Sequence, residues 1–152
     1  MGHVTDLWAQ QRCLIWDGVH FPDDTYVPLT GSTKRGYRAL ARGAIQDHPE
    51  YEEDAWGELD VLGAPACQGS YVAVAGEGAY EGVGFVALLR ASDRALVWIL
   101  CLDQLESVNR GVAIVGDTVE AVAECYPVRH EISVPIEEPW RCTILVTKMT
   151  DT

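Results

Sequence analysis

Apolar residues are concentrated in two long runs in the second half of the chain, residues 83–91 and 95–102. Nearly every position of both runs is apolar, a pattern typical of central strands that are covered on both faces. Ser92-Asp93-Arg94 separates the runs and predicts a tight turn. Shorter apolar or alternating runs predict further strands over residues 71–75, 112–115, 131–136 and 140–148.

The first half of the chain shows a helical pattern instead. Apolar residues recur there at three- and four-residue spacing: Tyr37, Leu40, Ala41, Ala44 and Ile45. This spacing predicts a helix that begins at Ser32 or Thr33 and ends before Pro49. A second, short helix is predicted over residues 50–59. A third helix is predicted from Asp117, although strict alternation there leaves a strand as the alternative.

Together these elements predict an α+β fold, a mostly antiparallel sheet of five or six strands covered by two or three helices. The 152 residues suit one domain that can bury a sizeable core. We therefore expect a single domain over residues 1–152, with residues 69–148 as the main sheet-forming part. The N-terminus shows no secretion signal, and the longest apolar run is too short to cross a bilayer, so a cytoplasmic protein is expected.

Acidic residues dominate the charge of the chain. It has 23 Asp and Glu against 11 Lys and Arg, a formal net charge of −12. Seven acids fall in one stretch that no basic residue interrupts: Asp47, Glu50, Glu52, Glu53, Asp54, Glu58 and Asp60. A surface of this sign repels nucleic acid and anionic membranes and attracts positively charged proteins. The sequence therefore predicts a basic protein partner, and neither nucleic acid nor a membrane.

Aromatic residues lie among or beside these acids. Tyr51 and Trp56 interrupt the acidic stretch, and Trp140 follows Glu137 and Glu138 in a loop that contains a proline. Aromatic anchors ringed by charge are common at protein interfaces. We therefore take these acidic and aromatic residues as candidate partner-binding residues. The alternatives are a solvated face that only aids solubility and, for Trp140, packing against the edge of the sheet.

Basic residues come directly before the acidic stretch. Lys34, Arg38 and Arg42 are four residues apart and would form one row on the predicted helix. That row could neutralise the acids within the fold, and loop acids such as Glu137 and Glu138 would then become the contact points. The sequence leaves both arrangements open.

Little in the sequence signals catalysis or a cofactor. The five cysteines include no Cys-x-x-Cys pair, and no two histidines have a metal-ligand spacing. Gly76 and Gly78 lack the third glycine and the following helix of a dinucleotide-binding loop. We therefore expect no metal and no cofactor. Cys125 and His130 form the one conceivable nucleophile pair.

These observations lead to a first hypothesis, an acidic binding protein that inhibits or neutralises a basic partner such as a nuclease or a toxin. Its role would be similar to that of bacterial immunity proteins and of phage-encoded nuclease inhibitors. The alternatives are a small enzyme or ligand-binding domain with a pocket between sheet and helices, and a structural subunit of an oligomer. A deep pocket that gathers Cys125, His130 or arginines would favour the enzyme or ligand-binding domain, whereas a flat acidic face would favour the binding protein.

Overall fold

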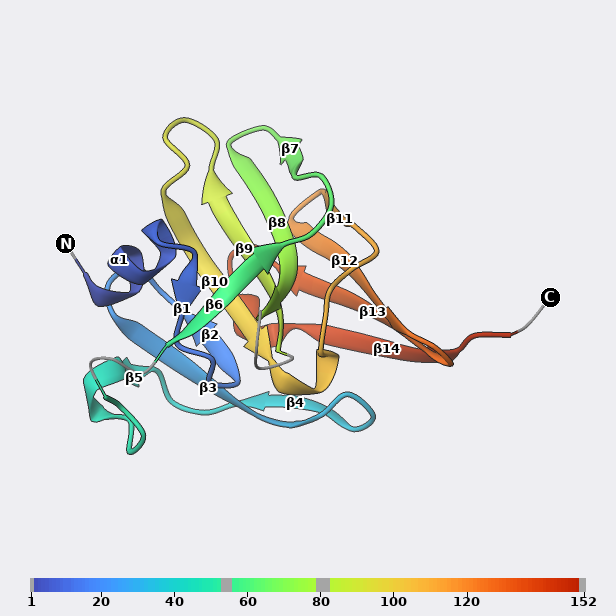
Figure 1. The fold of residues 1–152 in the computed structure, drawn as a ribbon, viewed down its shortest axis with the longest axis horizontal. Helices are drawn as coiled ribbons and strands as arrows, with labels where there is room; N and C mark the ends of the chain where they lie inside the picture. The colour runs from blue at the N-terminus through green and yellow to red at the C-terminus, as the bar shows by residue number, and fades with distance from the viewer. Residues whose placement is uncertain (1, 53–55, 79–82, 151–152) are drawn as a thin grey trace.

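Two antiparallel β-sheets make up most of the chain in the computed structural model, which describes residues 2–52, 56–78 and 83–150 (Figure 1). Within these residues, α1 (His3–Ala9) is the single α-helix. Three short 3-10 helices are also present: η1 (Ile45–Asp47), η2 (Asp103–Leu105) and η3 (Pro139–Arg141). The expected α+β fold with two or three covering helices is therefore wrong, because the fold is β-rich.

The larger sheet has ten strands. They are β1 (Arg12–Cys13), β2 (Gly18–His20), β3 (Thr25–Ser32), β4 (Gly36–Ala39), β5 (Gly43–Ala44), β6 (Gly57–Val61), β7 (Ala66–Gln68), β8 (Tyr71–Gly78), β9 (Gly84–Arg90) and β10 (Leu96–Leu102). Their order is β1-β6-β8-β9-β10-β2-β3-β4, with β5 paired to β3 and β7 paired to β8. The smaller sheet consists, in order, of β11 (Val112–Val115), β12 (Thr118–Cys125), β13 (Val128–Pro135) and β14 (Thr143–Lys148).

The central strands of the larger sheet bury both of their faces. On β9, Val86 and Leu88 enter a first core, whereas Phe85 and Ala87 enter a second core on the opposite face. A strand buried on both faces needs an apolar residue at every position. The strands predicted over residues 83–91 and 95–102 are confirmed as β9 and β10.

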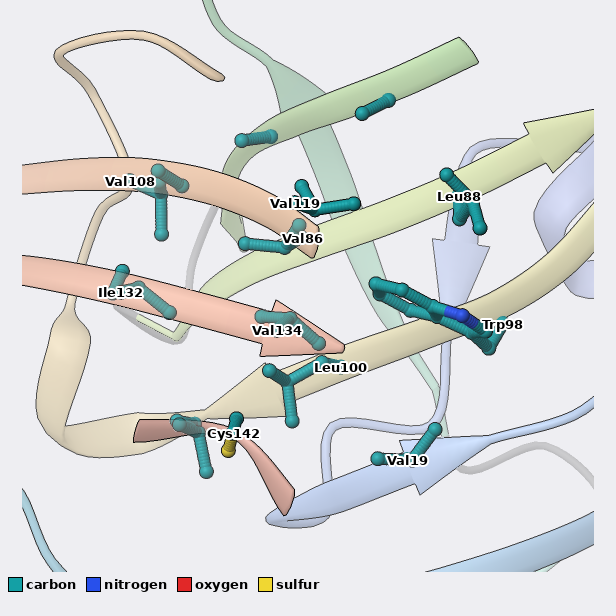
Figure 2. Close-up of a cluster of buried hydrophobic side chains, with 14 of the residues drawn as sticks. Val19, Val86, Leu88, Trp98, Leu100, Val108, Val119, Ile132, Val134 and Cys142 are labelled. Carbon is teal, nitrogen blue, oxygen red and sulfur yellow. The ribbon is translucent and has the colours of Figure 1, made fainter. Parts of the chain in front are cut away.

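The first core lies between the two sheets (Figure 2). Leu100 of the larger sheet packs in one cluster with Ile132 and Val134 of the smaller sheet, and all three are 0–1% exposed. Trp98 lies in the same cluster, and its indole N–H donates to the backbone carbonyl of Ile136 at 3.1 Å. This bond satisfies the buried polar atom of the indole and joins the two sheets.

The second core lies on the other face of the larger sheet. In Figure 1, β6 crosses over β8, β9 and β10, so the β1–β6 edge of the curled sheet covers this core. The Sγ atoms of Cys13 and Cys101 lie 3.3 Å apart, which brings β1 against β10 although the two strands are not paired. The sheet therefore almost closes on itself around the second core.

α1 covers part of the second core and is a helix that we did not expect. Val4 and Leu7 are its buried residues. Their three-residue spacing, continued by Trp8, is the signal that could have identified the helix. The side chain of Asp24 accepts the backbone N–H groups of His3 at 2.9 Å and Val4 at 2.8 Å, and so satisfies two free donors at the helix N-terminus.

The helix expected from Ser32 to Pro49 is wrong. β3 ends at Ser32, and Gly36, with φ of +85°, turns the chain into β4. Tyr37 and Ala39 then pack against the first core. The segment forms a strand despite its helical spacing, because its residues alternate between the two faces of β4 and the turn at Gly36 lets β4 pair with β3 of the larger sheet.

The other two expected helices are also wrong. Of residues 50–59, the structure describes 50–52 and 56–59, and the regular secondary structure among these is the start of strand β6 at Gly57. Residues from Thr118 form β12, which pairs with β11 on one side and with β13 on the other. Val119, Ala121 and Ala123 alternate into the first core, so the alternation in the sequence was the decisive signal.

Candidate functional site

Two acids of the predicted stretch stand on β6 on the face away from the second core. Leu59 is buried in that core, and the flanking Glu58 and Asp60 are exposed. Asp60 is paired directly with Glu77 of β8 across the ladder. We call Glu58, Asp60 and Glu77 the β6 acidic surface. Like charges directly opposite each other destabilise a sheet, so this arrangement costs stability.

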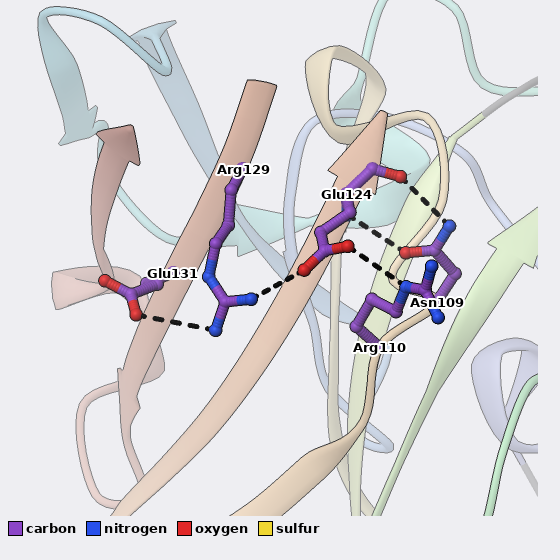
Figure 3. Close-up of polar contacts among 5 residues, drawn as sticks. All are labelled: Asn109, Arg110, Glu124, Arg129 and Glu131. Atoms are coloured by element: carbon purple, nitrogen blue, oxygen red, sulfur yellow. Dashed lines mark hydrogen bonds and ion pairs between the residues drawn. The ribbon is translucent and has the colours of Figure 1, made fainter. Parts of the chain in front are cut away.

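The ion pairs of the described residues are made elsewhere. Glu124 of β12, with a side chain 14% exposed, contacts Arg129 at 2.6 Å and Arg110 at 3.1 Å (Figure 3). The other ion pairs join Arg129 to Glu131, Arg42 to Asp23, Arg90 to Asp93 and Arg141 to Glu138. Within the described residues, no ion pair reaches the acids Asp47, Glu50, Glu52, Glu58, Asp60 or Glu77.

The basic residues before the acidic stretch do not form the row that we considered. Lys34 lies in the turn between β3 and β4, and Arg38 is exposed on β4. Arg42 pairs with Asp23 at 3.3 Å and places its guanidinium 3.8 Å above the ring of Phe21. The acids of the 47–60 stretch that the structure describes are therefore not neutralised by ion pairs with these residues.

The aromatic residues of the stretch are half-buried and fixed by neighbours. Tyr51 meets the ring of His3 edge-on, with centroids 6.0 Å apart. The guanidinium of Arg12 lies 3.7 Å from the centroid of Trp56. Both aromatic residues pack against the second core. Arg12 is also the cross-strand neighbour of Glu58, but no ion pair joins the two side chains among the described residues.

The remaining candidate residues fall into two groups. Glu53 and Asp54 lie outside the described residues. In the loop after β13, Glu137 is exposed and Glu138 binds Arg141 at 2.6 Å. Trp140 packs against the first core and meets Phe21 edge-on at 6.3 Å. Of the two roles considered for Trp140, packing against the sheet is the one that these contacts favour.

A cleft at the open end of the two sheets brings Cys125 and His130 together. Its volume is about 470 Å³, and its wall includes Lys34, Glu106 and Val128. The Cys125 thiol donates to the Glu106 carboxylate at 3.7 Å. Burial lowers the pKa of His130. The cleft therefore has room for a small ligand beside both side chains.

Asp17 is a half-buried acid that sequence reasoning missed. Its carboxylate accepts the backbone N–H of Asp103 at 2.8 Å and so joins the turn before β2 to η2. Burial raises the pKa of Asp17 to about 6, and the neighbouring carboxylate of Asp103 adds to the rise. Burial also raises the pKa of Tyr37, with a contribution from both acids. An Asp-Gly pair signals a turn, and no local pattern reveals this long-range contact.

No group of three or more His, Cys, Asp or Glu side chains in the described residues is arranged to hold a metal ion. None of the helices in that part of the chain is long and apolar enough to span a membrane. No protein-family model matches the chain, and no curated protein or solved structure shows a significant similarity to it. The function is therefore argued from the surfaces themselves.

Proposed function

We propose that this chain is a binding protein that inhibits or neutralises a basic partner protein, docking it through the β6 acidic surface and the adjoining loop. One observation carries the proposal. The described acids of the 47–60 stretch are exposed and unpaired, although arginines elsewhere pair with other acids. A protein that needed only solubility would gain nothing by placing Asp60 opposite Glu77.

These acids would attract the basic partner over a distance, and binding of the partner would relieve the repulsion between Asp60 and Glu77. A net charge of −12 attracts a cationic protein over several ångströms and raises the association rate at low ionic strength. A Lys or Arg of the partner that sits between Asp60 and Glu77 would replace their repulsion by two attractions. Partners of this chemistry include nucleases and toxins whose own sites bind anions. A cytoplasmic location, where the five cysteines would stay reduced, is part of the same proposal.

Capture from the source cell with two matched variants tests the docking site. Glu58→Gln with Asp60→Asn removes two charges from β6, and Asp117→Asn with Glu137→Gln removes two exposed charges elsewhere. We expect the wild type and the second variant to retain the same basic protein and the first variant to lose it. Equal retention by both variants would remove the β6 acids from the proposal.

A ligand-binding domain is a second candidate function, because the cleft gathers Cys125 and His130 in about 470 Å³. Clefts of this volume suit a small organic ligand. Native mass spectrometry after incubation with a cell extract tests it. A bound molecule that is present on the wild type and absent from a Val128→Trp variant, whose indole fills the cleft, would support this function. Equal spectra from both proteins would rule it out.

A further inference from the structure

A groove of about 650 Å³ lies beside β6. Trp8, Leu59 and Leu96, which belong to or pack against the second core, line its floor, and Val61 stands at its edge with 40% of its surface exposed. Arg94 also lines the groove. The groove therefore runs along the strand that carries Glu58 and Asp60 on its other face.

The edge of β6 away from β8 is unpaired at Val61, the last residue of the strand, which lies beside this groove. Leu59 donates its N–H to Gln11 at 2.8 Å, on the side away from β8. The N–H and C=O of one strand residue point to the same side, and this side alternates along the strand, so Val61 also directs both groups away from β8. The pairing of β1 with β6 does not extend to Val61, because the chain before β1 leaves the ladder at Gln11, with φ of +57°, and continues back into α1. Within the described residues, no hydrogen bond reaches Val61 on this edge.

We infer that a short extended segment of the partner pairs with β6 at Val61 in antiparallel fashion and adds a strand to the larger sheet. This inference rests on the proposed function and specifies how the partner docks. An open strand edge offers main-chain hydrogen bonds, and pockets for alternate side chains give specificity. The groove supplies such a pocket on one face, and the β6 acidic surface supplies complementary charge on the other.

The alternation of side chains predicts the composition of the segment. The residue opposite Val61 directs its side chain to the same face as Leu59 and enters the groove, so it is apolar. Its two neighbours lie on the face of Asp60, so they are basic. Arg94, which makes no ion pair with a described residue, excludes basic side chains from the groove face. The segment therefore alternates basic and apolar residues.

The inference is tested by the binding of Lys-Val-Lys-Val-Lys, acetylated and amidated at its ends, to the full chain. The NMR resonance of the Val61 amide reports the binding. We expect millimolar affinity and slower hydrogen exchange of the Val61 N–H. N-methylation of both valines removes the donors that face β6 and should weaken binding by about tenfold, the value of one lost hydrogen bond. N-methylation of the central lysine, whose N–H faces away from β6, is the matched control and should leave the affinity within about twofold.

The alternative results separate the inference from the proposed function. If the valine-methylated and lysine-methylated peptides bind equally, or if Glu-Val-Glu-Val-Glu binds as well as the lysine peptide, strand addition at Val61 is wrong. The proposed function would instead be overturned if neither salt nor substitution of Glu58 and Asp60 changed the capture of the basic partner. No response of Val61 to the lysine peptide also overturns the inference, and capture of the partner would be unaffected.

Discussion

Asp60 faces Glu77 across the β6–β8 ladder, and neither acid has an ion pair within the described residues. Asp60→Lys should replace this repulsion by an attraction and raise the free energy of unfolding by about 0.2–1 kcal/mol, as measured by urea denaturation. The same change should weaken binding of the partner. Asp117→Lys changes the net charge equally but has no acid opposite it in the strand pairing. Equal stabilisation by both variants would show that only net charge matters.

Asp17 should make stability depend on pH in the direction opposite to an ordinary surface carboxylate. Its pKa is about 6 in the folded protein against 3.8 for a free side chain, so the folded state binds the proton more tightly. This contribution is complete below pH 3.8 and is lost as the pH rises through 6. Asp17→Asn keeps an acceptor for Asp103 and should raise stability at pH 7 by about 1 kcal/mol after solvent screening.

Asp23 provides the control for Asp17. Burial acts to raise its pKa, but hydrogen bonds from Thr25 and the charge of Arg42 outweigh burial and lower it. Stability from Asp23 is therefore present at neutral pH and is lost as the pH falls through its lowered pKa, so Asp23→Asn should destabilise the protein more at pH 7 than in acid. Melting temperatures across this range measure both variants. A pH profile that Asp17→Asn leaves unchanged would contradict the assigned pKa.

At the residue scale, the exposure of the acids could be predicted and their neighbours could not. The acids of the 47–60 stretch that the structure describes are exposed, as a charged run implies. The pairing of Asp60 with Glu77 depends on the β6–β8 register, which no local pattern contains. The cleft likewise needs Cys125 at the end of β12 to meet Glu106 after η2.

At the scale of elements, α1 is held by a side chain distant in sequence. Asp24→Ala removes the acceptor for His3 and Val4 and should lower the free energy of unfolding by about 1 kcal/mol, the value of a helix N-terminal cap. Hydrogen exchange of residues 4–9 should rise, because α1 opens before the sheet does. Asp24→Asn keeps one acceptor and tolerates the positive φ of 63° at this position, so it should cost less. Unchanged exchange in Asp24→Ala would show that α1 is held by packing alone.

The elements that sequence patterns predicted well are those buried on both faces. β9 and β10 have apolar residues at nearly every position because both cores need them. The helical spacing between Tyr37 and Ile45 misled us, since the turn at Gly36 folds that segment into a hairpin on β3. A period over so few residues fits a strand with turns as well as a helix, and pairing with the sheet decides between them.

At the scale of the whole molecule, the larger sheet draws strands from both halves of the chain and serves two cores. Its β1–β6 edge covers the second core, while β12 and β13 cover the first. This arrangement places β6 at the surface, with acids on one face and a groove on the other. The composition predicted an acidic protein, but only the curled sheet shows which strand presents the acid.

The association rate of the captured basic partner, measured against ionic strength, tests the central claim most directly. Steering by exposed acids predicts an association rate that falls steeply as salt rises. The double variant Glu58→Gln with Asp60→Asn should make this salt dependence less steep. The double variant Asp117→Asn with Glu137→Gln should leave it nearly unchanged. A rate that is independent of salt, or a slope that both double variants reduce equally, would contradict docking through the β6 acidic surface.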